Sequence, residues 1–478
     1  MAGSRSMWRR LLEPTDIASL VYFRIVFGAI MVWECLRYFH YGWIQRAFIA
    51  PKFLFTYPGF DWVTPWSGDG MYYHFLGLGV LAFFMLAGFL YRISAILFFL
   101  AFTYVFLLSE TAYLNHFYLV ILISFIMIFV PAHRSFSVDA WMRKSIRSDW
   151  VPAWPLFLLR TQMGFVYFYA GIAKLNADWF QGYPILRWIK GFDEIPIIGG
   201  WIENETLALF LSYSGLALDL FCWPALLWKP TRIPAFVVLT LFHLTNAMIF
   251  QIGIFPWFSI AMTLLFFAPD WPRRVFRFRR AVPVPEAPTA PFSAPQQLAL
   301  ALVTVWVTLQ VMIPLRPHFY DGNPSWTEEA HRFSWRQKLR SKRSVLKYVL
   351  VDPATHKEWM VAPEEILSAR QWSVMAGRPE MIVQLAHYIS ELATEEGQPR
   401  VRVHAFGFVS LNGRAPQPLL DPAKNLADVK RTFFEPYDFI VPLEIPLSSQ
   451  WDEGEITDPQ SLELLERYKA THRRGPSP

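Results

Sequence analysis

Long runs of apolar residues follow one another along this chain and restrict what it can fold into. The hydrocarbon core of a membrane is about 30 Å thick, and roughly 20 helical residues cross it. By that measure about nine spans precede residue 316, at 17–38, 71–90, 93–110, 113–131, 155–174, 206–228, 232–250, 252–268 and 297–315. We therefore expect a polytopic α-helical membrane bundle over residues 1–316.

The composition agrees with a membrane protein. Of the 478 residues, 54% are hydrophobic and only 17% are charged, which is far from the average of soluble domains. The basic N-terminus lacks a small-residue cleavage site, so the first run is predicted to be a retained span. Both cysteines, Cys35 and Cys222, lie in apolar runs, which excludes a disulfide framework or thiolate metal site in the polar C-terminal third.

Basic residues are concentrated in alternate loops, and this bias sets the orientation of a membrane protein. With a cytoplasmic N-terminus, the inner loops carry Arg5, Arg9, Arg10, Arg92, Arg134, Arg143, Lys144, Arg147, Lys229, Arg232, Arg273, Arg274, Arg277, Arg279 and Arg280. The opposite loops hold few. Because an odd number of spans carries the chain across, the residues after 316 are predicted to be periplasmic or extracellular.

The C-terminal part is predicted to be a mixed, β-rich soluble domain over 317–450, with a short helix and tail at 451–478. "SVLKYVLVD" and "HKEWMVA" read as a hairpin, "PEMIVQLAHYISELATEEG" as an amphipathic helix, and "RVRVHAFGFVSLNG" as a strand entering an Asn-Gly turn. "FIVPLEIPL" favours an edge strand. The basic run "RQKLRSKRS" (336–344) has two interpretations: an attractor of acidic peptides or lipid head groups, or a solvated strand edge.

Ionisable and polar residues inside spans are costly and usually face a cavity or a partner. Lys174, in "FYAGIAKLNADWFQGYPI", lies at the outer end of the fifth span, and His116 begins the fourth from the same side. His243 and Asn246 lie about one turn apart on the outer half of the seventh span, so they share a face. Under the topology inferred from loop charge, these groups converge in one leaflet and predict a shared site.

Each of these residues also has a structural alternative. Lys174 can extend its amine to the interface, as lysines at helix ends commonly do. Asn115 can cap a helix that starts beside His116. His243 and Asn246 can form hydrogen bonds that hold their helix to a neighbour.

Helical steps back from Lys174 reach Gly171 and Tyr167, so a neighbouring helix or a flat ligand can approach closely on that side. Beyond Leu175, Asp178 and Gln181 fit a capping box that starts a short outer helix.

Trp179 is then expected at the membrane interface. Covered in this way, the amine of Lys174 is partly removed from water, which disfavours its ammonium form and makes it a usable base.

"YFYAGIAKLNADWFQGY", "LNHFYLV", "FHLTNAMIFQIGIF" and "HRFSWR" (331–336) together resemble the vitamin K-dependent γ-glutamyl carboxylases and their bacterial relatives. The resemblance covers residues 12–345 most clearly, and the membrane part resembles the horizontally transferred transmembrane domain of that family. It implies a carboxylase, a carbon-carbon lyase, that also forms quinone epoxide. In that family, vitamin K hydroquinone reacts with O₂ to give a strong base, a peptide glutamate loses a γ-proton, and the carbanion takes up CO₂.

Residue by residue, the resemblance implies that Lys174 deprotonates the hydroquinone and that Asn115 and His116 lie near the glutamate carbanion. His243 and Asn246 match a polar stretch lining the same region. These two, with Tyr167 and Gly171, are predicted to contact the cofactor, a phylloquinone or menaquinone hydroquinone. No metal is expected.

The resemblance implies a glutamate-containing peptide or protein as the partner, besides the lipid membrane, and no nucleic acid. The chain is shorter than the animal enzymes and lacks the cysteines of their inter-domain disulfide, which leaves the protein substrate, the quinone and the oligomeric state open.

Two alternatives to a carboxylase remain: a quinone epoxidase or oxidase that carboxylates nothing, and a non-catalytic membrane binding protein. The sequence contains no phosphate-binding glycine loop, "HExxH" or "GxSxG" motif, which disfavours an ATP-driven transporter or a zinc protease.

Overall fold

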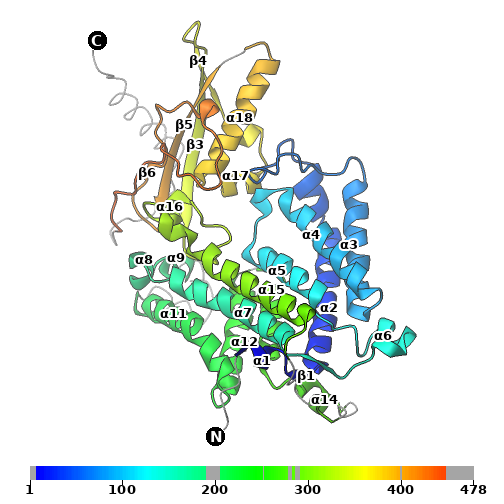
Figure 1. The fold of residues 1–478 in the computed structure, drawn as a ribbon. Helices are drawn as coiled ribbons and strands as arrows, with labels where there is room; N and C mark the ends of the chain where they lie inside the picture. Colours follow the sequence, from blue (N-terminus) through cyan, green and yellow to red (C-terminus); the bar gives the residue numbers. More distant parts are fainter. Residues whose placement is uncertain are drawn as a thin grey trace.

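The computed structural model describes residues 7–189, 205–250, 252–277, 283–285, 291–398 and 401–447. A bundle of helices forms most of the molecule, and a smaller domain with a sheet stands at one end of it (Figure 1). The first described helix, α1 (Met7–Leu11), lies at the opposite end of the bundle from this domain.

Apolar helices build the bundle, close to the predicted limits. They are α2 (Ala18–His40), α3 (Gly70–Ala87), α4 (Tyr91–Leu107), α5 (Asn115–Phe129), α7 (Trp154–Ala173), α11 (Glu205–Leu227), α12 (Arg232–Ile249), α13 (Phe255–Thr263) with η5 (Leu264–Phe266), and α15 (Ala294–Met312) with η6 (Ile313–Phe319). Within the described residues, five of these (α2, α3, α7, α11 and α15 with η6) are long and apolar enough to cross a membrane, and the others are shorter apolar helices. A helical membrane region is therefore confirmed, whereas the number of nine spans stays a prediction.

Short elements connect the long helices. At the end of the bundle away from the sheet are α1 (Met7–Leu11), β1 (Pro14–Asp16), α6 (Val138–Met142), η3 (Lys144–Ile146), β2 (Trp150–Pro152) and α14 (Trp271–Val275), with β1 and β2 paired antiparallel. Towards the smaller domain with the sheet, which we call the outer domain, are η1 (Gln45–Ile49), η2 (Glu110–Ala112), α8 (Ala177–Phe180) and α9 (Ile185–Ile189).

Helix α7 is the central helix of the bundle. Pro155 lies in its first turn, where the missing N–H costs nothing. Of its most apolar stretch of 18 residues, 78% is buried inside the protein. It packs against α5, α11, α13 and α15. At Gly164 an added Cβ would lie 2.2–2.5 Å from the ring of Trp223 on α11, so only glycine permits this close approach of the two helices.

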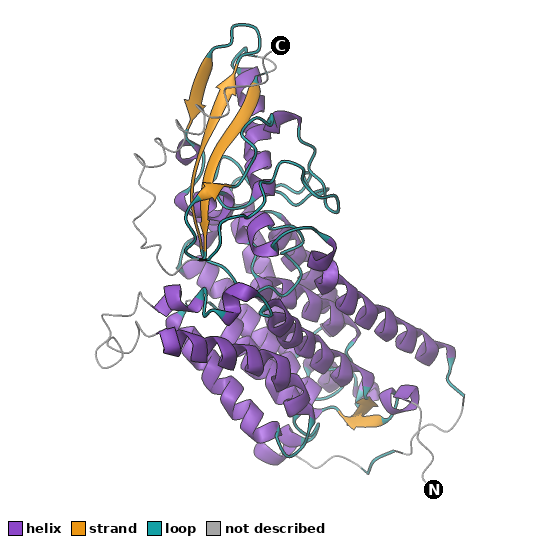
Figure 2. Ribbon diagram, turned by 90° about the vertical axis from the view of Figure 1, so that its left-hand side faces the viewer, coloured by secondary structure: helices purple, strands orange, loops and turns teal. Residues whose placement is uncertain are grey.

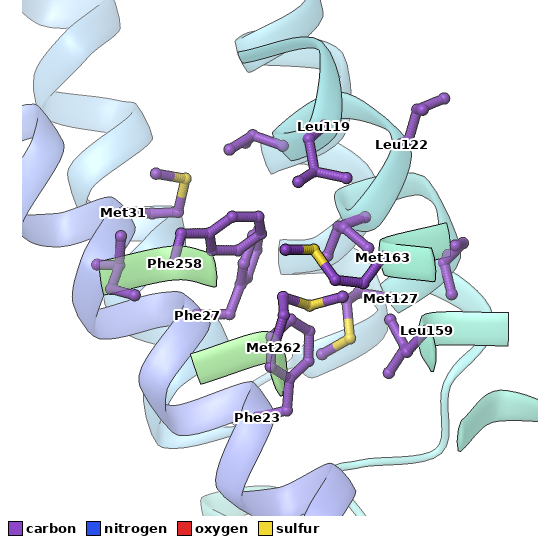
Figure 3. Close-up of a cluster of buried hydrophobic side chains, with 14 of the residues drawn as sticks. Phe23, Phe27, Met31, Leu119, Leu122, Met127, Leu159, Met163, Phe258 and Met262 are labelled. Atoms are coloured by element: carbon purple, nitrogen blue, oxygen red, sulfur yellow. The ribbon is translucent and has the colours of Figure 1, made fainter. Parts of the chain in front are cut away.

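The core of the bundle is filled by aromatic and sulfur-containing side chains. Figure 3 shows Phe23 and Phe27 of α2 directed towards Phe258 and Met262 of α13 and Met163 of α7. On the outside, large apolar side chains such as Tyr73, Phe210 and Phe221 are 65–70% exposed, as expected of helices that face lipid tails rather than water.

The outer domain contains a four-stranded antiparallel sheet in the order β4-β3-β5-β6, with helices against it (Figure 2). Its elements are α16 (Pro324–Thr327), β3 (Lys342–Val351), β4 (Glu358–Val361), η7 (Pro363–Glu365), α17 (Ala369–Met375), α18 (Pro379–Glu395), β5 (Arg402–Leu411), β6 (Gln417–Pro418) and η8 (Leu426–Asp428). Strand β3 pairs with β5 from Lys342↔Leu411 to Val351↔Arg402. The apolar face of α18 closes the core against this sheet.

The predicted hairpin, the amphipathic helix and the strand that enters the Asn-Gly turn are therefore confirmed. The edge strand predicted for "FIVPLEIPL" is wrong, apart from one isolated bridge between Leu420 and Ile440, because Pro442 and Pro446 cannot donate to a ladder. The predicted helix and tail at 451–478 lie outside the described residues.

Outer loops of the membrane bundle dock onto the outer domain. Phe55, from the loop between α2 and α3, is fully buried in the core of the outer domain. In the same loop Asp61 accepts a hydrogen bond of 2.6 Å from Arg431 Nη1, and Glu110 of η2 pairs with Arg332. The two domains thus share both apolar and charged contacts.

A buried cluster around Glu328 uses two charges of the basic run 336–344. Arg340 donates two hydrogen bonds of 2.5 Å to the Glu328 carboxylate, and Lys342 Nζ lies 2.7 Å from Oε1. Lys342 also donates to the carbonyls of Trp326 and Gly377. Two of the positively charged side chains in this run, Arg340 and Lys342, are therefore paired with a carboxylate inside the protein.

Burial alone would raise the pKa of Glu328, but attraction to Arg340 and Lys342 outweighs it and holds this pKa well below its ordinary value of 4.5. A lowered carboxyl pKa contributes stability that is present above the ordinary value and lost as pH falls through the folded-state pKa.

We therefore expect Glu328→Gln to destabilise the protein by about 3–5 kcal/mol at pH 7, because two buried cations lose their partner. This difference should shrink as pH falls below 4.5. Thermal unfolding of both proteins in detergent between pH 3 and pH 7 measures it. A difference that stays constant across this range contradicts the assigned pairing.

Candidate active site at the outer end of helix α7

Lys174 is the C-cap residue of α7, directly after Ala173, and its side chain turns back into the protein. Only 7% of Lys174 is exposed. Its Nζ donates to Asp219 Oδ2 at 2.5 Å and to the carbonyl of Ala170, one turn back on α7, at 3.3 Å. The amine is therefore not extended to the lipid head groups, which excludes that structural alternative for the described conformation.

Asp219, on α11, is the charged partner of this lysine. Its side chain is 7% exposed and that of Lys174 is 9% exposed, so the ion pair is shielded from water. Two opposite charges in such surroundings stabilise each other far more than on a surface, whereas either one alone is costly. The sequence prediction missed Asp219, although an acid inside the apolar run "LALDLFC" carried the same signal as Lys174.

Trp179 forms a roof over the ion pair. Its ring centre lies 5.1 Å from Lys174 Nζ, which is within the range of a cation–π contact. The indole N–H donates to the carbonyl of Ser212 on α11 at 2.8 Å. Only 3% of Trp179 is exposed, so protein surrounds the ring, and its position at the membrane interface stays a prediction.

The predicted capping box is wrong, because Asn176 and not Asp178 is the N-cap of α8. The side chain of Asn176 accepts from Trp179 N at 3.0 Å and donates to Ala173 O at 2.9 Å. Asn176 therefore joins the end of α7 to the start of α8 and fixes the tight turn that covers Lys174. Asp178 is free of the capping role and makes other contacts.

His243 of α12 and Tyr167 of α7 form a second buried pair. Tyr167 Oη and His243 Nε2 are 2.7 Å apart, and His243 is 1% exposed. The other ring nitrogen, Nδ1, is buried and has no hydrogen-bond partner among the described residues. Such an unpaired polar atom inside a protein is unfavourable and is a natural contact for a ligand hydroxyl.

Phe255, the first residue of α13, brings the two histidines together. Its ring stacks on His116 with centroids 5.8 Å apart and meets His243 edge-on at 5.7 Å. His116 is 9% exposed. Three helices, α5, α12 and α13, thus contribute to one aromatic cluster near Tyr167.

Asn115 lies at the start of α5 and faces the outer domain. Its Oδ1 accepts from Tyr113 Oη at 2.9 Å, and its Nδ2 donates to the carbonyl of Arg336 at 3.5 Å. The side chain does not cap α5, which has Leu114 as its N-cap with no side-chain hydrogen bond. Asn115 therefore connects the predicted site to the "HRFSWR" segment.

The structure joins some of the predicted site residues directly and others less closely. Tyr167 and Lys174 share one face of α7 and are seven residues apart, which is about 10 Å along a helix. Asn246 is half-buried on α12, and no side-chain hydrogen bond links it to His243 within the described part of the chain. At Gly171 an added Cβ would lie 2.7 Å from the side chain of Leu220 on α11, so that helix fills the adjoining space. Direct contact of Gly171 with a cofactor stays a prediction.

A small apolar cavity of about 20 Å³ lies between α2, α3, α4 and α5. Its walls are mainly aromatic rings, and Phe117, next to His116, is one of them. Glu34 also lines it and forms an ion pair of 2.5 Å with Arg37. The walls have the apolar chemistry that a flat, lipid-soluble ring would contact, but the cavity itself has room for about one water molecule. Among the described residues, no group of three or more His, Cys, Asp or Glu could hold a metal ion.

Comparison with known families places both parts of the chain. Residues 12–271 match the HTTM domain, and residues 295–445 match the lumenal domain of vitamin K-dependent gamma-carboxylase. No solved structure matches the chain.

The Lys174–Asp219 pair predicts strong thermodynamic coupling. Asp219→Asn and Lys174→Met should each lower the free energy of unfolding by about 3–5 kcal/mol, because each leaves a buried charge alone. The double variant Lys174→Met/Asp219→Asn should lose much less than the sum. Denaturant unfolding of the four proteins in the same detergent gives the coupling energy, and additive losses would mean that the two side chains do not interact.

Proposed function

Since the chain belongs to the vitamin K-dependent γ-carboxylase family, we propose that it is a membrane enzyme that carboxylates glutamate side chains of a peptide or protein. In this proposal the reaction uses a reduced vitamin K-type quinone, O₂ and CO₂. The observation that carries it is a lysine, Lys174, held in a covered, water-poor position between a carboxylate and an aromatic roof, in a chain with both family domains. A proton-transfer group needs such a buried environment with a charged partner beside it.

We assign the four shorter apolar helices (α4, α5, α12 and α13) as membrane spans, together with the five long ones. With the N-terminus in the cytoplasm, this arrangement puts the basic loops inside and the outer domain outside. The outer end of α7, where Lys174 lies, then belongs to the same side as the outer domain. A peptide outside the cell or in the periplasm reaches the site without crossing the membrane.

The residues present fit a reduced quinone. The fit is one of chemistry: the aromatic walls beside Phe117 would contact its ring, and the unpaired Nδ1 of His243 would contact one of its hydroxyls, while the cavity of about 20 Å³ must widen to admit the ring. When bound, the quinone together with O₂ supplies the strong base that removal of a glutamate γ-proton needs, which no side chain of the protein can supply.

In this mechanism Lys174 accepts the first proton, from a quinol hydroxyl, at Nζ. Asp219 allows this because the pair can rearrange from ammonium and carboxylate to amine and carboxylic acid with no change in net charge. Trp179 and the α7–α8 turn exclude water, so the proton does not exchange with solvent. Asn115 and His116 are positioned by α5 to donate hydrogen bonds to the charge that develops on the glutamate.

Assays on the purified protein in lipid nanodiscs test this proposal. With a reduced quinone, a glutamate-rich peptide and labelled bicarbonate, we expect label in the peptide and quinone epoxide among the products. Lys174→Ala should lower both by at least about a hundredfold, since positioned proton transfer contributes factors of this size. Lys229→Ala, a lysine exposed at the inner end of α11, is the matched control and should behave as wild type.

Normal epoxide formation by Lys174→Ala contradicts the assignment of the base. Epoxide without labelled peptide from the wild-type protein identifies a quinone-oxygenating enzyme that does not carboxylate. Phylloquinone and menaquinone are compared in parallel, so that the preferred quinone is determined in the same experiment.

A further inference from the structure

A turn of the outer domain reaches down to the short helix that covers Lys174. Strand β5 ends at Leu411, and Asn412 and Gly413 both adopt positive φ angles, of 52° and 89°. This tight turn directs Arg414 towards α8. Arg414 Nη1 and Nη2 donate to the two carboxylate oxygens of Asp178 at 2.7 and 2.6 Å.

The contact is shielded from water on both sides. Asp178 is 6% exposed, Arg414 is 7% exposed and Asn412 is 1% exposed. Asn412 Nδ2 donates to the same carboxylate at 2.8 Å, and Arg414 Nε donates to the carbonyl of Ile445 at 3.0 Å. A bidentate arginine–carboxylate contact in which both partners form further hydrogen bonds fixes the orientation of the two side chains as well as the distance between them.

Asp178 transmits this contact to the amine of Lys174 over a very short path. Helix α8 has only four residues, and Asp178 is next to Trp179 in it. One neighbour is Trp179, whose ring lies 5.1 Å from Lys174 Nζ. The other side of the helix is tied to α7 by Asn176, which donates to Ala173 O.

We propose that Arg414 is a positioning residue for the Lys174–Asp219 pair: by holding Asp178, the outer domain keeps α8 and Trp179 closed over the amine. Without this contact α8 keeps its connection to α7 and its hydrogen bonds with neutral donors, from Trp179 to Ser212, from Tyr213 to the Phe180 carbonyl and from Asn412 to Asp178, but it loses its charged link to the outer domain. The cover then opens more often and water reaches Lys174. The consequence for catalysis rests on the proposed function, whereas the closure itself does not.

A second inter-domain ion pair provides a matched control. Arg431 of the outer domain binds Asp61, in the loop between α2 and α3, at 2.6 Å. This pair joins the same two domains but belongs to the segment that docks beside α18, and neither residue contacts α8. Arg431→Ala removes an inter-domain arginine and leaves the cover over Lys174 unchanged.

Amine labelling followed by peptide mass spectrometry tests the closure on the full chain in nanodiscs. In the wild-type protein, Lys174 should react far more slowly with a water-soluble acylating reagent than the exposed Lys229. Arg414→Ala should increase the labelling rate of Lys174 by roughly tenfold or more, because a hydrogen-bonded charged contact is lost. Arg414→Lys should restore part of the protection, and Arg431→Ala should give the wild-type rate.

Equal labelling of Lys174 in wild type and Arg414→Ala overturns the proposal, and so does an equal increase in Arg431→Ala, which would indicate general loosening of the two domains. Should Arg414→Ala fail to fold, Asp178→Asn keeps the size of the side chain, removes its charge and is read in the same way.

Turnover provides the catalytic arm of the test. Arg414→Ala should lower kcat by roughly tenfold or more, since small misplacements of reacting groups have effects of this size, with the KM for peptide unchanged and partial rescue by Arg414→Lys. A raised KM with normal kcat assigns Arg414 to peptide binding instead and overturns the positioning role. If the wild-type protein carboxylates no peptide, the proposed function fails, and the labelling rates still decide whether Arg414 closes the site.

Discussion

The buried ion pair between Lys174 and Asp219 determines how α7 and α11 pack at the outer end of the bundle. Neither charge tolerates apolar surroundings alone, so α7 and α11 must stay in register where the pair forms. The close contacts of Gly164 with Trp223 and of Gly171 with Leu220 run along the same two helices. The close packing of α7 on α11 and the ion pair between them thus support each other. The amine of Lys174 stays beneath α8, and water reaches it when this short helix moves.

The outer domain is part of the site rather than an appendage to it. It contacts the bundle through Phe55 and Glu110 on one side and through Asp178 on the other. Asn115, which the family resemblance relates to the glutamate, lies where α5 meets the backbone of Arg336. In the proposed function, a peptide bound by the outer domain would lie close to the residues assigned to its carboxylation, and a quinone would approach from the lipid.

Much of this arrangement follows from the sequence, and the failures have definite physical causes. Helix positions follow from apolar runs, and Lys174, His116 and His243 stand out because ionisable groups are rare in such runs. Asp219 carried the same signal and was missed. The contact of Arg414 with Asp178 joins residues 236 positions apart, and no local pattern predicts such a pairing. Trp179 was expected at the interface because tryptophan often lies there; its contact with the amine comes from tertiary packing, which no local pattern predicts.

The central claim is that Lys174, and not another group, meets the reduced quinone at the outer end of α7. An experimental map of the protein with a non-oxidisable hydroquinone analogue in nanodiscs tests it most directly. We predict that one hydroxyl of the analogue lies within hydrogen-bonding distance of Lys174 Nζ, with the ring beside Tyr167 and His243. An analogue bound wholly between α2 and α5, with Lys174 still closed on Asp219 and out of reach, would contradict this account.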